Sequence, residues 1–310
     1  NLVINPSVDS IQEFKIQKSQ YPAEFGGKAS ALINVATRAG TNALRASVFE
    51  FLRHDMFDAH NYFDPHDQPI PPLRQNQFGG ALGGPLVHDR SFFFFSYERH
   101  RVRRSLTRTF SVPTLAARSG DFSGLAPVCD PVTLDSAAGV CTPFAGNRIP
   151  ASRIDPLAAA FLHHVPQATS AAALQNLTSV GRQAKDVDQI SLRIDHRFRK
   201  GDQLFARLST FDADEMQPFG TSSLQETLVP GFGRNVSTKA RNVAASHTRL
   251  FGSLVMNELR FGWMKVRGGQ ISQNRGVDFA SQVGLQGVTT DPRDVGFPQI
   301  STRGLYSTFG

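Results

Sequence analysis

Residues 189–212 read QISLRIDHRFRKGDQLFARLSTFD, and this stretch decides the fold. Apolar side chains occupy alternate positions of its first half, with polar side chains between them. The apolar set is Ile190, Leu192, Ile194 and Phe198, and the polar set is Ser191, Arg193, Asp195 and Arg197. A period of two indicates a strand with one apolar and one polar face. RKGD (199–202) is a tight turn, so the stretch predicts a β-hairpin.

The same pattern extends along most of the chain. In the last predicted strand Val255, Leu259, Phe261 and Trp263 share a face, while Glu258 and Arg260 point the opposite way. Seven strands are predicted, near residues 44–53, 75–87, 92–110, 188–199, 203–212, 240–250 and 254–267. The fold class is therefore mainly β, with an antiparallel up-and-down order.

Residues 1–42 have a different pattern, which predicts a small α+β unit. SIQEFKIQ (10–17) is a short β-like run, and YPAEFGGKASA (21–31) carries Gly26 and Gly27. LINVATRAGTN (32–42) reads as a buried strand followed by a turn.

The connections between the seven strands alternate between short and long. The tight turns are HDRS (88–91), RKGD (199–202) and LFGS (250–253), and the long connections lie near 54–74, 111–187 and 213–239. In an up-and-down sheet, alternate connections lie on opposite sides. All the tight turns then fall on one side, which is typical of outer-membrane β-barrels with short periplasmic turns and long external loops. A loop of some 77 residues with little regular structure would count against a soluble domain.

The chemistry of a lipid bilayer explains such a design. Hydrocarbon offers no hydrogen-bond partners, so every backbone N–H and C=O must pair within the protein. A tilted strand of about 9–11 residues is long enough to cross. The charged faces, with Arg193, Asp195, Arg197, Glu258 and Arg260, are then expected to point into the barrel. Seven strands are too few, and odd in number, for a closed bacterial barrel, so part of a larger barrel is expected.

Two predicted strands depart from simple alternation, and each has two interpretations. SFFFFSYERH (91–100) contains four consecutive Phe residues, which suit an aromatic girdle at the membrane interface or a strand buried on both faces. FGGALGGPL (78–86) carries Gly79, Gly80, Gly83 and Gly84. These glycines let another backbone approach closely, as a plug would in a barrel, or they mark a bulge or bend.

Composition narrows the class of protein. Hydrophobic residues make up 40%, mean hydropathy is −0.24, and no stretch approaches the roughly 18 apolar residues of a membrane-spanning helix. An α-helical membrane protein is therefore excluded, whereas a membrane barrel is not. The net charge is +7, but only Arg99–Arg104 is dense, and no zinc-finger, RNP or helix-turn-helix pattern accompanies it. We expect no nucleic-acid partner.

Two cysteines, Cys129 and Cys141, lie twelve positions apart in a Pro/Gly-rich stretch. An exported protein can pair them, and closing this loop would contribute on the order of 3 kcal/mol; two free thiols are the alternative. The chain begins NLVINPSVDS, without an initiator Met or a signal peptide. Either the protein stays in the cytoplasm or the chain is part of something longer, and the strand count favours the second.

Eight stretches, in order, resemble TonB-dependent outer-membrane transporters, specifically the Oar-like group. They are VDSIQEFKIQ, YPAEFGGKASALINVATRAGTN, FEFLRHDMFDAHNYF, PPLRQNQFGGALGGPL, SFFFFSYE, VPT…R.GDFS, TPFAGNRIPASRIDP and RIDHRF, which together cover most of residues 3–212. The resemblance implies that residues 1–42 are the C-terminal part of a plug domain. Residues 43–310 would be the N-terminal part of a 22-stranded β-barrel.

The resemblance also implies a function and partners. Such transporters take up a large or scarce substrate across the outer membrane of a Gram-negative bacterium. Energy arrives from a TonB–ExbB–ExbD-type complex, here through a segment absent from this sequence, and the barrel contacts outer-membrane lipid. Siderophores, cobalamin, glycans and peptides are all family substrates, so the substrate-binding residues stay unknown.

Enzyme and metal chemistry have little support in the sequence. His54, Asp55, Asp58 and His60 form an HDxxDxH cluster, His163 and His164 are adjacent, and Asp58, Asp64 and Asp67 suggest a calcium site. None has supported ligand spacing, and no HExxH, GxSxG, P-loop or GxGxxG after a strand is present. We expect no enzyme activity, no cofactor, no metal and no catalytic residues.

The main alternative is a secreted or periplasmic all-β binding or adhesion module. It would use the same strands and the same disulfide. It differs in one prediction: the apolar faces should pack on a second sheet. Burial of Ile190, Leu192, Leu259 and Trp263 in a sandwich core would favour it, and exposure of these side chains would favour the barrel.

Overall fold

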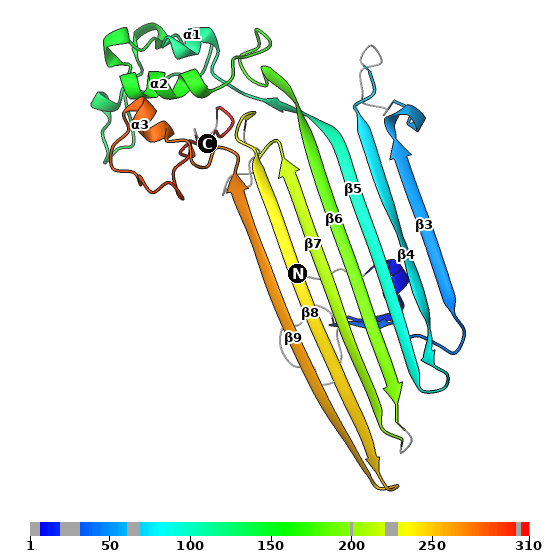
Figure 1. The fold of residues 1–310 in the computed structure, drawn as a ribbon. Helices are drawn as coiled ribbons and strands as arrows, with labels where there is room; N and C mark the ends of the chain where they lie inside the picture. The colour runs from blue at the N-terminus through cyan, green and yellow to red at the C-terminus, as the bar shows by residue number, and fades with distance from the viewer. Residues whose placement is uncertain are drawn as a thin grey trace. The chain divides into compact units, whose positions relative to one another are not determined.

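The structure is a computed structural model that describes residues 7–18, 32–60, 69–198, 201–220, 229–301 and 305–309. The chain divides into two compact units (Figure 1). The wall unit comprises residues 1–104, 184–215 and 236–269, and the loop unit comprises 105–183, 216–235 and 270–310.

The described residues form a seven-stranded antiparallel sheet in which every strand pairs with its neighbour in sequence (Figure 1). Its strands are β3 (Arg45–His54), β4 (Leu73–Val87), β5 (Ser91–Phe110), β6 (Leu177–Arg197), β7 (Gln203–Gln217), β8 (Arg234–Phe251) and β9 (Val255–Ser272). Strands β3 and β9 are the two edges, so the sheet is open. A 3-10 turn, η3 (Asp55–Phe57), follows β3. The predicted fold class is confirmed.

All seven predicted strands are present, but four extend at least five residues further at one end than predicted. Strand β6 begins at Leu177 rather than near 188, and β7 ends at Gln217 rather than near 212. Strands β8 and β9 likewise extend to Arg234 and Ser272. The extra residues lie beside the long connections and are largely polar, so they carry no alternation signal. Backbone pairing continues there although neither face needs to be apolar.

The sheet has one inward and one outward face. Arg193 identifies the inward face, because its guanidinium reaches back to Thr37 at the start of the chain. A set of exposed apolar side chains alternates with it on the outward face, and we call this set the apolar band. The band comprises Val48, Leu82, Phe95, Ile190, Leu192, Ile194, Leu204, Leu208, Leu259, Phe261 and Trp263.

The apolar band has no protein cover, which decides between a barrel wall and a sandwich. Ile190 is 38% exposed, Leu259 67% and Trp263 46%. Within the described ranges no second sheet packs on these side chains. An apolar face of this kind needs a lipid environment, because water would leave a large apolar patch exposed. The sandwich expectation is therefore wrong.

The phenylalanine run has a single alternation, contrary to burial on both faces. Phe92 and Phe94 are buried on the inward side, whereas Phe95 is exposed in the apolar band. The Pro85–Phe92 and Leu82–Phe95 pairs fix this register with β4. The sequence hides the alternation because Phe occupies both faces.

The N-terminal residues form a separate two-stranded antiparallel sheet of β1 (Ile11–Gln17) and β2 (Leu32–Thr37). The 3-10 turn η1 (Val8–Ser10) precedes it, and the N–H of Arg38 donates to the carbonyl of Ser10 at 2.9 Å. The stretch with Gly26 and Gly27 lies outside the described residues.

The loop unit is a packed structure rather than a loop with little regular structure. It contains α1 (Leu115–Arg118), η4 (Pro131–Thr133), η5 (Ala145–Asn147), η6 (Ala151–Arg153), α2 (Pro156–His164) and α3 (Phe279–Val283). Its core gathers Phe110, Val112, Phe161, Val165, Leu177, Phe219, Val229, Phe232, Phe297 and Phe309. These residues come from three distant stretches of sequence, which explains why local patterns did not reveal the core. Among the described residues no helix has the length and apolar character needed to cross a membrane.

Candidate functional site

The segment that follows β2 lies against the inward face of the wall. Arg193 Nη1 donates to the Thr37 carbonyl at 2.9 Å and to Thr37 Oγ1 at 3.3 Å. Asp195 holds the same guanidinium from its other side, with Nε–Oδ2 and Nη2–Oδ1 distances of 2.8 and 2.7 Å. Alternation places Arg193 and Asp195 side by side on one strand face, as the sequence predicted. One arginine thus joins residues 156 positions apart.

Gly40 lets this segment approach the wall closely. A Cβ atom at this position would overlap the Phe93 carbonyl and would lie 2.8 Å from the Gly84 carbonyl oxygen. Gly83 lies on the inward face beside this segment, since its Cβ would be 3.8 Å from Gly40 Cα. Gly84 points to the opposite face, where its Cβ would lie 2.8 Å from Cδ1 of Leu44, the residue that precedes β3. The β4–β5 register is regular through all four glycines and shifts beyond them, between Pro85 and Val87, so the bulge does not account for the glycines.

Asn42 makes two further polar contacts that fix the segment, and Ser47 joins β3 to η1. Asn42 Nδ2 donates to Asp89 Oδ1 at 2.5 Å, and the Asp89 N–H donates to Asn42 Oδ1 at 2.9 Å. Asp89 occupies the tight turn between β4 and β5 with a φ of 61°, a conformation that Asn and Asp tolerate better than most residues. Ser47 on β3 donates to Asp9 at 3.3 Å.

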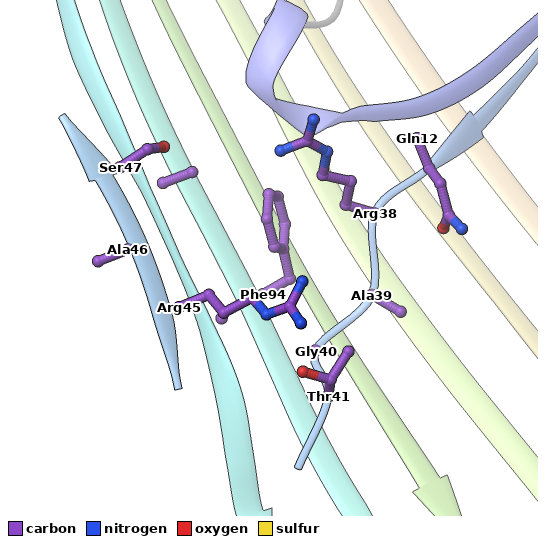
Figure 2. Close-up of a pocket in the computed structure, with 11 residues that line it drawn as sticks. Gln12, Arg38, Ala39, Gly40, Thr41, Arg45, Ala46, Ser47 and Phe94 are labelled. Carbon is purple, nitrogen blue, oxygen red and sulfur yellow. The ribbon is translucent and has the colours of Figure 1, made fainter. Parts of the chain in front are cut away.

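Two cavities flank the segment. One of about 540 Å³ is lined by Gln12, Arg38, Gly40, Arg45, Ser47 and Phe94 among others (Figure 2). The other, of about 510 Å³, is lined by Thr41, Arg193, Asp195, Phe205 and Glu258 among others. Both combine charged groups with aromatic rings.

In the loop unit, two side chains organise the long connection between β5 and β6. Asn176 is buried and bonds Val112 twice, accepting from its N–H at 2.9 Å and donating to its carbonyl at 2.8 Å. Arg118 donates to four carbonyls, those of Pro113, Leu162, Val165 and Pro166. It thereby satisfies carbonyls at the end of α2. Burial lowers the pKa of the Arg118 guanidinium from its usual value.

Arg118 belongs to the stretch VPT…R.GDFS, but its role could not be recognised from sequence because three of its four acceptors lie 44–48 residues away. The helix it caps did have a local signal. Asp155 caps the N-terminus of α2 through the N–H of Leu157 at 2.7 Å, and Pro156 follows it at the first helical position.

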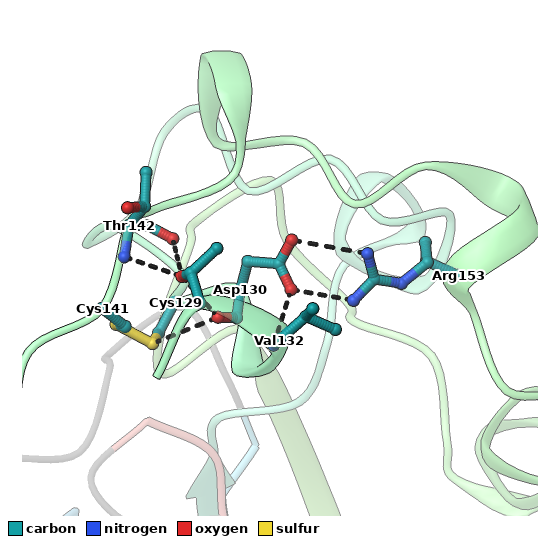
Figure 3. Close-up of polar contacts among 7 residues, drawn as sticks. Cys129, Asp130, Val132, Cys141, Thr142 and Arg153 are labelled. Atoms are coloured by element: carbon teal, nitrogen blue, oxygen red, sulfur yellow. Dashed lines mark hydrogen bonds and ion pairs between the residues drawn. A yellow bond between two sulfur atoms is a disulfide. The ribbon is translucent and has the colours of Figure 1, made fainter. Parts of the chain in front are cut away.

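The predicted cysteine pair lies in a hairpin of the loop unit (Figure 3). Cys129 and Cys141 have a Cα–Cα distance of 5.8 Å and are placed as a disulfide. Beside them Arg153 Nη2 donates to Asp130 Oδ1 at 2.8 Å, and the Val132 N–H donates to the same oxygen at 3.0 Å. Both interactions hold the pKa of the Asp130 carboxyl below its usual value, and the bond from Arg153 has the larger effect. The covalent bond itself stays a prediction.

The histidines and acidic residues considered as metal ligands have other partners. His54 Nδ1 accepts from the Met56 N–H at 3.1 Å, and Asp58 pairs with Arg53 at 3.2 Å. His164 packs on Phe279 and Phe297, with ring centroids 5.2 and 5.8 Å apart. Asp64 and Asp67 lie outside the described residues. No group of three or more potential ligands occurs in the part of the chain that the structure describes.

Comparison with known proteins agrees with this geometry. The sequence model of the family described as "Outer membrane beta barrel domain" matches residues 36–310. The chain is 30% identical over 110 residues to the TonB-dependent transporter Oar of Myxococcus xanthus, a match that covers 34% of this chain and 10% of the relative. The chain thus spans only a small part of that relative's length. No solved structure matches.

The two matches point to an outer-membrane barrel and a transporter rather than to an enzyme family. They also agree with the uncovered apolar band and with the alternation of tight turns and long connections. The protein is located in the outer membrane. Because the family match covers most of its length, this chain belongs to the outer membrane beta barrel domain family.

Proposed function

We propose that this chain is part of a TonB-dependent transporter of the Oar-like group, which takes up a large or scarce substrate with energy from a TonB–ExbB–ExbD-type complex. Residues 1–42 are the end of its plug, and residues 43–310 are the first strands of its barrel. The observation that carries the proposal is the contact between Arg193 on the wall and Thr37 at the end of β2. It is what a plug terminus leaving the lumen beside its own barrel would make.

Two further observations support the proposal. Gly40 permits backbone-to-backbone approach where the segment meets β4 and β5 of the wall. The Oar relative of Myxococcus xanthus is itself a TonB-dependent transporter. An adhesion module would not need an uncovered apolar band, so this alternative has no specific support.

The test uses the full-length protein in its own bacterium. Cells are supplied with defined mixtures of peptides, siderophores and oligosaccharides, and depletion of each compound from the medium is measured by mass spectrometry. We expect at least one compound to be taken up only when both the transporter gene and the tonB gene are intact. Uptake that persists without TonB would exclude energised transport, although the barrel itself would stand.

A second measurement addresses the partner directly. The purified periplasmic domain of TonB is mixed with the full-length transporter in detergent, and complex formation is followed by size-exclusion chromatography. We expect a complex. Its absence, together with TonB-independent uptake, would contradict the proposal and favour a passive barrel.

A further inference from the structure

Arginines cluster on the outward face of the wall, beyond the apolar band and towards the long connections. Arg74 lies on β4, and Arg99, Arg101 and Arg103 occupy alternate positions of β5. The strand register sets Arg74 directly opposite Arg103. Tyr97, two residues before Arg99 on the same face, marks the end of the band, as an interfacial aromatic residue does. We call the four arginines, Arg74, Arg99, Arg101 and Arg103, the arginine cluster.

Neighbouring carboxylates neutralise the arginine cluster only in part. Asp186 binds Arg103 closely, with Nη2–oxygen distances of 2.7 and 3.0 Å, but lies 3.7 Å from Arg101 Nε. Asp188 lies 3.5 Å from Arg99. The other acidic group nearby is Glu50 on β3, which the register places opposite Phe78 rather than opposite an arginine. Across the described residues, no carboxylate forms an ion pair with Arg74, which is exposed.

Arg103, directly opposite Arg74, turns its guanidinium towards β6, where it bonds Asp186 and the carbonyl oxygen of Lys185. Arg74 therefore keeps a positive charge that Arg103 and its carboxylate do not balance, and an anion beside it would be attracted. Guanidinium groups bind phosphate through two parallel N–H···O bonds, so phosphate fits best. Arg74 and Arg101 are diagonal neighbours across the strand pair, within the reach of such long side chains.

The height of the arginine cluster indicates which phosphate. Successive members on β5 are two residues apart, so Arg99 and Arg103 are separated by about 13 Å along the strand, or about 9 Å in height for a strand tilted by about 45°. The polar layer on each side of an ordinary bilayer is only about 5–7 Å thick. A phospholipid headgroup would reach the lowest row alone. A tall phosphorylated glycolipid would reach all of them.

We propose that the arginine cluster binds the phosphate groups of lipopolysaccharide in the outer leaflet of the outer membrane, with Arg74 and Arg101 providing the donors that no carboxylate holds closely. Arg99 and Arg103, each paired with an aspartate, fix the two sides of the site. The proposal depends on the chain's location in the outer membrane and is independent of energised uptake. If lipopolysaccharide binding is disproved, the proposal of energised uptake still stands, and the reverse is also true.

The test uses the full-length protein, purified in detergent and freed of lipid, with rough lipopolysaccharide as the probe and native mass spectrometry as the readout. The double variant Arg74→Gln/Arg101→Gln is expected to bind it about 30-fold more weakly, because each basic residue near a charged membrane surface contributes a few-fold. The matched control Lys185→Gln/Arg207→Gln removes the same charge from the inward face and is expected to bind like the wild type.

Two competitors identify the source of the phosphate. Millimolar inorganic phosphate should not displace the bound glycolipid, and phosphatidylglycerol should bind weakly and equally to all variants. Unchanged binding by the double variant, displacement by inorganic phosphate, or equally tight phosphatidylglycerol binding would each overturn the proposal. Circular dichroism checks strand content. If the Gln variant loses it, Arg74→Lys/Arg101→Lys keeps the charge but not the two-pronged geometry, and it should bind several-fold more weakly than the wild type.

Discussion

The wall unit and the loop unit place their apolar side chains in opposite ways. The loop unit buries phenylalanines such as Phe161 in a conventional core, whereas the wall unit leaves Leu192 and Ile194 uncovered on its outward face. The inward face of the wall carries Arg193 and Asp195 instead. One chain is thus adapted to two surroundings, water around one unit and lipid around the other. The buried fraction of an apolar side chain therefore indicates its contribution to stability in the loop unit. In the wall unit it does not, because lipid can cover a side chain that the protein leaves exposed.

The largest expected change in stability tests this comparison with one substitution in each unit. Phe161→Ala should destabilise the loop unit by about 3–5 kcal/mol, because it opens a cavity in a packed core. Phe161 is 7% exposed, whereas Phe95 in the apolar band is 39% exposed. Phe95→Ala should cost less, since lipid chains can fill the space. Urea titration of the full-length protein in vesicles, with probes in each unit, measures both. Equal costs would mean that protein rather than lipid covers Phe95.

The next effect sharpens the assignment of the two faces. Leu192→Arg places a charge in the apolar band and should destabilise the inserted barrel by about 2–4 kcal/mol if it lies near the bilayer midplane. The matched control is Ser209→Arg, whose residue alternates with Leu208 on β7 and faces inward. It should cost little. Folding into vesicles, followed by protease protection, distinguishes them, and a larger cost for Ser209→Arg would reverse the faces.

The predicted disulfide should affect the loop unit alone. Replacing Cys129 and Cys141 by Ser should lower its stability by at most about 3 kcal/mol, because the closed loop is short. Mass spectrometry of the untreated protein should show a peptide pair that separates on reduction. Two alkylated free thiols without reduction would contradict the pairing. The wall unit should be unaffected.

The smallest effect concerns pH. The pKa of Asp130 is lowered, so its contribution is present above the pKa of the unfolded chain and is lost as the pH falls through the lower folded value. The hairpin around η4 should therefore loosen below about pH 4. Hydrogen exchange at the Val132 amide measures this, with Asp130→Asn as the pH-insensitive comparison. Identical pH profiles for the two proteins would exclude this role.

Strands were predictable because alternation is local, whereas contacts that join distant segments were not. Ile190 to Phe198 revealed β6 and its two faces, and the tight turns revealed the order of the sheet. The bond between Arg193 and Thr37 joins residues too far apart for any pattern to reveal. The roles of Asn176 and Arg118 were unpredictable for the same reason, because both bind backbone groups of residues distant in sequence. The outer halves of β6 and β7 were missed because polar strands in water have no required period.

The connection between β2 and β3 consists of residues 38–44, and it is a short covalent tether. Seven residues extend to at most about 25 Å. The two-stranded sheet of β1 and β2 can therefore lose its contacts with Arg193 and still move only within that radius of the first strand of the wall. Any rearrangement of this end of the chain is therefore short in range. It is also reversible, because the tethered two-stranded sheet stays at high effective concentration beside the groups that bind it.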